Sequence, residues 1–264
     1  MTGELLYGKS EFAIFLGFLF SLILAGEGGY WLGRRKRHSF EEATKPQFST
    51  IQGSVLGLLA LLLAFTFGMA QSRFEFRPRE VLEESNAIGT AYLRTRLLPE
   101  LYRTDAATLL RQYVDARLEF YEARMDSTKL SAAIGTSEQV QRKLWSQAIA
   151  ASAQDPRSVS IALYLQSLNE VIDVHSKRVA AFRNRVPEIV LVLLLAVGIL
   201  AMAVTGYGWA QGNRPHRLLT GILSILIALV VLVIMDLDRP RRGLIRVSQQ
   251  SMIDLRDSLN EASP

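Results

Sequence analysis

The sequence predicts an all-α membrane protein with four transmembrane helices and a helical extramembrane domain between the second and the third. Two features of the 264-residue chain indicate this: four apolar stretches of bilayer length, and a long intervening stretch rich in Ala, Leu, Glu, Arg and Gln. About 20 mostly apolar residues in helical form cross a bilayer core, because lipid offers no partner to backbone polar groups. The residue types of the long stretch are good helix formers.

The four apolar stretches cover residues 12–32, 51–70, 189–209 and 218–235. A secretory signal peptide carries positive charges before its apolar run and a cleavage site after it. Here Glu4 and Glu11 precede the first stretch, and Arg34 and Arg35 follow it. This order is typical of a stop-transfer helix that stays in the membrane.

Glu27 is the one charged residue of the first stretch, and it lies among Gly26, Gly28 and Gly29. In a membrane span, such glycines favour close packing between helices rather than a phosphate-binding loop. We interpret Glu27 as a carboxylate at the membrane rim that reaches water or pairs with Arg34. A role in an ion path is the alternative, since ionisable residues in spans are often functional.

The chain divides into four segments along its length. They are a first transmembrane hairpin at 1–71, the helical extramembrane domain at 72–187, a second transmembrane hairpin at 188–236 and a polar C-terminal tail at 237–264.

Prolines and apolar periodicity divide the extramembrane domain further. They predict helices at 79–97, 102–125, 137–153 and 158–185, and a loop at 126–136 where Ser127, Thr128 and Gly135 stand. Apolar stripes on the second and fourth of these helices favour a helical bundle or hairpin.

Composition excludes several classes of function. The net charge is +5, but the basic residues gather at the ends of apolar runs, where they anchor helices, so we expect no nucleic-acid partner. The chain has no Cys, and His38, His175 and His216 are scattered without carboxylates at metal-ligand spacing. No nucleophile and base stand together. We therefore expect no enzyme, no metal and no cofactor.

The basic residues near the first span also predict orientation. The loop at 33–50 carries five of them, against Lys9 alone in the amino-terminal tail. Lys and Arg are retained in short cytoplasmic loops. We therefore predict a multi-pass protein of the bacterial inner membrane, with short loops in the cytoplasm and the helical domain on the extracytoplasmic side.

Charged residues gather after the second and fourth apolar stretches. This charged helix-end cluster comprises Arg73, Arg77, Asp236, Asp238, Arg239 and Arg241. Two carboxylates at the end of an apolar helix need cations nearby. They either lock the helix end structurally or form a charged ring at a pore mouth.

A polar stripe follows the second span. Asn86, Thr90 and Arg94 are spaced at i, i+4 and i+8, which places them on one face of a helix. A solvated face usually carries more Glu and Lys. The stripe is therefore interpreted as lining an aqueous vestibule or facing a partner helix.

Two segments carry a resemblance to a known family. The bacterial bestrophin-like domain family has signature segments that are similar to residues 86–94 with the following 98–100, and to residues 236–243. The resemblance to this family covers nearly the whole chain. Residues 73–77 also resemble the aromatic and arginine cluster after the second helix of bestrophins. The resemblance implies a pentameric anion channel with an apolar neck on the second span and a helical cytoplasmic domain, which opposes the orientation predicted above.

In this sequence the neck positions would be Leu59, Leu63 and Phe67, at i, i+4 and i+8 on one face of the second span. One hypothesis is therefore an oligomeric ion channel that conducts anions, with the lipid bilayer, further copies of the chain and a small inorganic ion as partners. The alternative is a non-conducting membrane scaffold or sensor whose helical domain binds a partner.

Overall fold

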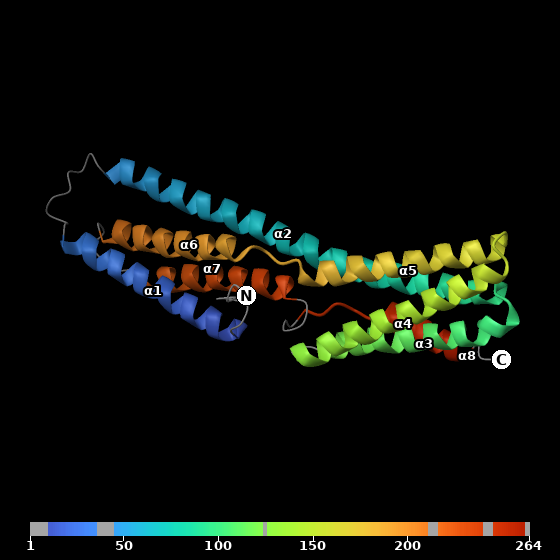
Figure 1. Cartoon of the computed structure of the whole chain (residues 1–264). Coiled ribbons are helices and arrows are strands. Elements are labelled where there is room, and N and C mark those ends of the chain that lie inside the picture. Colours follow the sequence, from blue (N-terminus) through green and yellow to red (C-terminus); the bar gives the residue numbers. More distant parts are fainter. Residues whose placement is uncertain (1–9, 36–44, 124–125, 211–215, 240–244, 262–264) are drawn as a thin grey trace. The chain divides into compact units, whose positions relative to one another are not determined.

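The structure is a computed structural model, and it describes residues 10–35, 45–123, 126–210, 216–239 and 245–261. These residues form helices and contain no strand, in the order α1, α2, η3, α3, α4, α5, α6, α7, α8 (Figure 1). Four helical stretches hold windows long and apolar enough to cross a membrane: Glu11–Arg35, Pro46–Leu97, Val159–Trp209 and Arg217–Asp238. The predicted fold class is confirmed.

The chain forms two compact units. Unit 1 contains Met1–Ser72 and Arg185–Arg239, and unit 2 contains Arg73–Asn184 and Pro240–Pro264. Helix α2 (Lys45–Arg94) belongs to both, because it runs without interruption through the boundary between Ser72 and Arg73.

Unit 1 contains the apolar spans: α1 (Glu11–Arg35), the first part of α2, α6 (Glu188–Trp209) and α7 (Arg217–Asp238). Helices α1 and α6 approach each other closely at glycines. A Cβ added to Gly206 would lie 1.9 Å from the carbonyl oxygen of Gly26, and one added to Gly29 would lie 2.0 Å from that of Ala203. Gly26 and Gly29 of the first span therefore serve helix packing, as predicted, because small residues let backbones meet in lipid. Gly28 does not, since no atom lies within 4 Å of the position that its Cβ would take.

Glu27 pairs with Arg217 at the start of α7, not with Arg34. The distance from Glu27 Oε1 to Arg217 Nε is 3.2 Å, and Arg34 Nη1 donates instead to the hydroxyl of Tyr30 at 3.1 Å. The Glu27 side chain is 43% exposed within the single chain. This geometry agrees with a carboxylate at the membrane rim.

Unit 2 is a helical bundle formed by the last part of α2, η3 (Thr95–Leu97), α3 (Glu100–Glu122), α4 (Ser127–Gln154), α5 (Val159–Arg183) and α8 (Gln250–Glu261). Helix α3 packs on α4 and α8, and α4 packs on α5. Figure 1 shows α3, α4 and α5 running alongside one another. The core includes Ile88, Leu110, Leu144, Tyr164 and Leu168.

The predicted loop at 126–136 is wrong, because α4 begins at Ser127. Asp126 is its N-cap, and the carboxylate accepts hydrogen bonds from the amides of Thr128 and Lys129 at 2.9 and 3.0 Å. This cap satisfies amides that otherwise lack partners in a first turn. Gly135 lies inside the helix, with open space at the position that a Cβ would take. Turn-forming residue types here mark a capped helix start rather than a loop.

Two other boundaries differ from the sequence prediction. The second span and the helix predicted at 79–97 are one helix, and Pro78 lies inside it as part of α2. A proline removes one helical hydrogen bond, and packing of the flanking turns outweighs that loss. The polar C-terminal segment contains α8, whose Met252 and Leu259 are buried in the core of unit 2.

Candidate functional site

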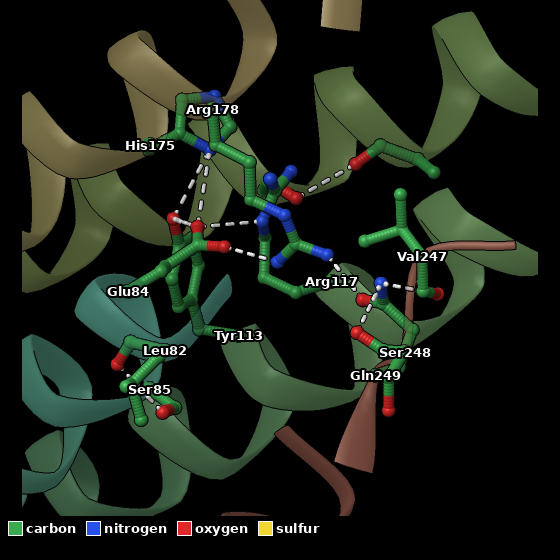
Figure 2. Close-up of polar contacts among 12 residues, drawn as sticks. Leu82, Glu84, Ser85, Tyr113, Arg117, His175, Arg178, Val247, Ser248 and Gln249 are labelled. Carbon is green, nitrogen blue, oxygen red and sulfur yellow. Dashed lines mark hydrogen bonds and ion pairs between the residues drawn. The ribbon is translucent and has the colours of Figure 1, made fainter. Parts of the chain in front are cut away.

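A charged cluster lies inside unit 2, and its centre is Glu84 of α2, which is 0% exposed. Nε of Arg117, from α3, lies 2.7 Å from Glu84 Oε1. Arg178, from α5, donates from Nη1 to Glu84 Oε2 and from Nη2 to the side-chain oxygen of Gln249. Figure 2 shows both guanidinium groups beside the carboxylate. One carboxylate thus joins three helices and the segment before α8.

Neutral side chains also lie beside the Glu84 carboxylate. The hydroxyl of Tyr113 donates to Glu84 Oε1 at 3.1 Å and lies 3.1 Å from Nδ1 of His175 (Figure 2). It also accepts from Gln141 Nε2 at 3.1 Å. A hydroxyl has one proton to donate. Because Tyr113 gives that proton to Glu84, we infer that His175 carries its own proton on Nδ1 and donates to the tyrosine oxygen.

The electrostatics fix the charge of each group. Burial raises the pKa of the Glu84 carboxyl, but Arg117 and Arg178 together outweigh burial and hold that pKa below its usual range. Burial, aided by the charge of Arg117, lowers the pKa of His175 to about 4. Burial and the nearby Glu84 raise the pKa of Tyr113 well above its usual value. At neutral pH, Glu84 is therefore ionised, whereas His175 and Tyr113 are neutral.

The cluster holds more positive than negative charge. Arg117 is 0% exposed, and its Nη1 and Nη2 have no hydrogen-bond partner among the described residues. Its Cζ lies 4.6 Å from the centre of the Phe120 ring, a distance at which a cation is attracted to an aromatic face. Two guanidinium groups against one carboxylate leave a surplus of one buried positive charge, which is costly unless something compensates it.

A small cavity lies beside the cluster. Its volume is about 40 Å³, and its polar lining consists of Arg77, Glu80, Arg178 and Gln249. Aromatic and aliphatic side chains form the rest of its wall, among them Phe120, Phe182 and Val247. The cavity therefore places charged groups against an apolar surface.

Sequence reasoning did not assemble this site. Arg117 lies on the second predicted domain helix and His175 on the fourth, both of which carry an apolar stripe, but the sequence assigns neither residue a role. An ionisable residue at an apolar-stripe position was the available signal, because such positions face a core. Nothing in the sequence paired these residues with Glu84.

The polar stripe of α2 is split in two by the structure. Asn86 and Thr90 are exposed and line an open groove with polar residues of α5, including Asn169 and Asp173. Arg94 is half-buried, and its Nη1 donates to the carbonyl of Leu163 at 2.7 Å. Asn86 and Thr90 thus share a surface, whereas Arg94 ties α2 to α5. The vestibule or partner-facing role of the stripe stays a prediction.

The three neck candidates differ in exposure within the single chain. Leu59 is 2% exposed and packs inside unit 1, Leu63 is half-buried and Phe67 is 39% exposed. A pore between subunits is lined by side chains that one subunit leaves uncovered. Phe67 meets that condition best, and the pore-lining role of all three stays a prediction.

The charged helix-end cluster falls in both units. In unit 1, Asp238 is fully buried and accepts from the amide of Val186 at 2.9 and 3.1 Å, and Arg239 lies 3.5 Å from Glu11. In unit 2, Arg77 donates to the carbonyl of Asn184 at 3.4 Å, and Arg73 Nε lies 3.5 Å from the Asn184 side-chain oxygen.

These contacts fix helix ends and the segment before α6, which favours structural locking over a charged ring. Asp236 is also buried at the end of α7. Arg241 lies outside the described residues.

The fold and the apolar spans define a multi-pass, all-α membrane protein. The Bestrophin-like domain family matches residues 13–252 of the sequence. The chain therefore belongs to the Bestrophin-like family, as its signature segments predict. A search of curated proteins finds no match.

Solved structures share the fold. One crystal structure of a bacterial bestrophin homologue from Klebsiella pneumoniae has a TM-score of 0.68 at 14% identity, covering 96% of this chain and 98% of that one. A second has a TM-score of 0.64 at 15% identity, covering 93% and 98%. A crystal structure described as a membrane protein reaches 0.63 at 15% identity, covering 93% and 98%. At these identities, the likeness shows the fold alone.

Proposed function

We propose that this protein is an oligomeric ion channel that conducts anions, with the second span, in α2, forming an apolar neck. The observation that carries the proposal is the similarity to bestrophin homologues over almost the full length of both chains. Bestrophins, which the sequence resembles, are anion channels. The four spans of one chain are too few to enclose a pore, so several copies, as in the pentamer of bestrophins, surround the axis.

The burial of the four spans supports this role for α2. Only 17% of its most apolar window is buried inside the chain, against 28% for α1, 39% for the window in α6 and 33% for α7. The second span therefore has the largest share of surface left for neighbouring copies, lipid or a pore. A ring of apolar side chains there would resist wetting, which is one way a channel closes.

Exposure ranks the neck candidates. Phe67 reaches the surface of the single chain, Leu63 does so in part, and Leu59 packs inside unit 1. In this proposal Phe67 forms the narrowest apolar ring, and Leu63 and Leu59 support it from the same face. Phe67→Ala should therefore have a larger effect on conduction than Leu59→Ala.

Chloride flux from liposomes tests the proposal. Phe67→Ala should release chloride faster than the parent, because a smaller side chain widens and hydrates the neck. Phe20→Ala is the matched control, since Phe20 is also an exposed phenylalanine, 63% exposed, but lies on α1. It should behave as the parent. Equal flux from both variants, or none from any folded protein, would contradict the proposal.

The scaffold alternative has one observation in its favour, the open groove between α2 and α5 in unit 2. Glu83, Asn86 and Thr90 line one wall, and Asn169 and Asp173 line the other. Polar side chains facing each other across a groove suit a polar partner segment. The scaffold predicts no current, and it predicts that Asn86→Trp blocks partner capture.

We further propose a bacterial inner-membrane location with the helical domain on the extracytoplasmic side. The support is the bias of basic residues toward the loop after the first span. Alkaline phosphatase inserted at Arg157, in the turn between α4 and α5, should be active, and a fusion at Lys45 should be inactive. The reverse pattern would place the domain in the cytoplasm.

A further inference from the structure

The cavity beside the charged cluster is the size of a small hydrated ion. Its volume is about 40 Å³. One water molecule needs roughly 10–15 Å³ of such space, whereas drug-sized ligands occupy pockets of about 300 Å³ or more. The cavity can therefore hold roughly three waters, or one small ion with a water or two, but not an organic cofactor.

The charges near the cavity favour a negative occupant. Arg178 lines it directly, and the Cζ of Arg117 lies 4.6 Å from the centre of the Phe120 ring, which also lines it. These two guanidinium groups share one carboxylate, that of Glu84, and both Nη atoms of Arg117 lack a hydrogen-bond partner among the described residues. A buried cation surplus is stabilised by an anion held within a few ångströms.

Glu80 lines the same cavity and decides how an anion could enter it. Its side chain is 2% exposed, and Oε2 has no hydrogen-bond partner among the described residues. As a carboxylate, this group would repel an anion. As a carboxylic acid, it has one proton to donate, and an anion is the acceptor it lacks.

Neighbouring groups favour the acid form of Glu80. Burial raises the pKa of the Glu80 carboxyl, Glu83 and Glu84 raise it further, and Lys177 opposes them. The other ionisable groups that line the cavity with Glu80 are Arg77 on α2, Tyr121 on α3 and Arg178 on α5.

We propose that this cavity binds one small monovalent anion of chloride size between the guanidinium of Arg178 and the protonated carboxyl of Glu80, so that each anion enters with one proton. The proton comes from solvent and stays on Glu80 while the anion is bound. The site lies wholly within unit 2 of one chain. It therefore does not depend on the proposed pore or on an oligomer.

Calorimetric titration of the purified full-length protein with potassium chloride tests the site. Potassium gluconate, whose anion is too large for the cavity, keeps the ionic strength constant and serves as the reference titrant. Chloride should bind at pH 5.5, and the accompanying proton uptake should rise toward one per anion as the pH passes the pKa of Glu80, measured as a buffer-dependent heat. Affinity should fall by up to about tenfold for each pH unit above the pKa of Glu80.

Three variants at two positions of α2 test the role of Glu80. Glu80→Gln keeps a neutral donor, so it should bind chloride without proton uptake and with the same affinity at pH 5.5 and 8.0. Glu83→Gln removes an exposed carboxylate one turn away that raises the pKa of Glu80, so it should keep proton uptake but move the pH dependence to lower pH. Glu80→Leu removes the donor and should weaken chloride binding at pH 5.5 by about tenfold or more.

Three results would overturn the proposal. They are no chloride binding at pH 5.5, chloride binding by the parent without proton uptake at any pH from 5.5 to 8.0, and proton uptake that persists in Glu80→Gln. Bromide soaked into crystals gives an independent location, because its anomalous signal should appear beside Arg178. A bromide signal confined to the membrane spans would also reject the site.

Discussion

Unit 1 and unit 2 are both built from helices, but their interiors are held together in different ways. In unit 1, α1 and α6 meet backbone to backbone at Gly26 and Gly206, and no side chain lies between them. In unit 2, side chains separate the helices, and at the centre Glu84 is shared by Arg117 and Arg178.

The difference follows from the solvent of each unit. Lipid is as apolar as leucine, so burying apolar side chains gives little driving force between spans, and close backbone packing must supply it. In a water-exposed bundle, apolar burial supplies the driving force. A buried charged cluster adds little net stability there, but it permits few alternative arrangements of the helices around Glu84. We therefore expect a different kind of substitution to destabilise each unit.

The largest expected effect is in unit 2. Glu84→Gln should lower the free energy of unfolding by about 3 to 5 kcal/mol, because it leaves two buried guanidinium groups without their carboxylate. Glu83→Gln, one residue away and exposed, should change it by less than about 0.5 kcal/mol. Thermal unfolding in detergent measures both. Equal stability of the two variants would show that Glu84 does not hold the bundle together.

The matching test in unit 1 is Gly206→Ala. Its Cβ would lie 1.9 Å from the carbonyl oxygen of Gly26, so α1 and α6 must separate, at a cost of about 1 to 3 kcal/mol. Gly221→Ala is the control, since no atom lies within 4 Å of its Cβ position on α7. Folded yield from membranes should fall for the first and stay unchanged for the second. Equal yields would reject close packing as the basis of this interface.

Asp238 tests whether polar contacts also matter in unit 1. Asp238→Ala removes both acceptors from the buried amide of Val186, which should lower stability by about 1 to 3 kcal/mol. The melting temperature should fall accordingly. Asp238→Asn keeps one acceptor oxygen and should recover part of the loss. If Asp238→Ala has the same melting temperature as the parent, the contact with Val186 does not stabilise the end of α7.

His175 gives unit 2 a dependence on pH. Its pKa is about 4 in the folded protein and about 6.5 in an unfolded chain, so the unfolded state binds more protons between these values. The contribution of His175 to the free energy of unfolding is therefore fully present above pH 6.5. It should fall toward pH 4 by at most about 1.4 kcal/mol per pH unit. His175→Gln should remove the fall between pH 6.5 and 5, measured by thermal unfolding. A parent that is equally stable at both values would contradict the account.

Only part of the fold could be predicted from the sequence. The spans were predictable, because a run of about 20 mostly apolar residues has the length that a helix needs to cross the bilayer core. The start of α4 was not, because Ser127, Thr128 and Gly135 are turn formers whose meaning changes once Asp126 caps a helix. The continuity of α2 through Pro78 was not predictable either, since a proline usually ends or kinks a helix.

The charged cluster could not be predicted for a different reason. Glu84, Arg117 and Arg178 stand on three helices far apart in sequence, and charged residues on helices face water by default. Only the packing of the bundle turns them toward one another. For the neck candidates, spacing in the sequence predicted one property but not another. Their shared face was predictable from spacing, but which of Leu59, Leu63 and Phe67 the chain itself covers depends on how the spans pack.

Planar bilayer recording of the purified protein and of the triple variant Leu59→Ala, Leu63→Ala and Phe67→Ala tests the proposed function most directly. We predict a constitutive, weakly selective current from the triple variant that exceeds the current of the parent, because three smaller side chains leave the neck wide and wet. A folded triple variant that stays silent under salt gradients and applied voltage would contradict the channel, and it would favour the scaffold.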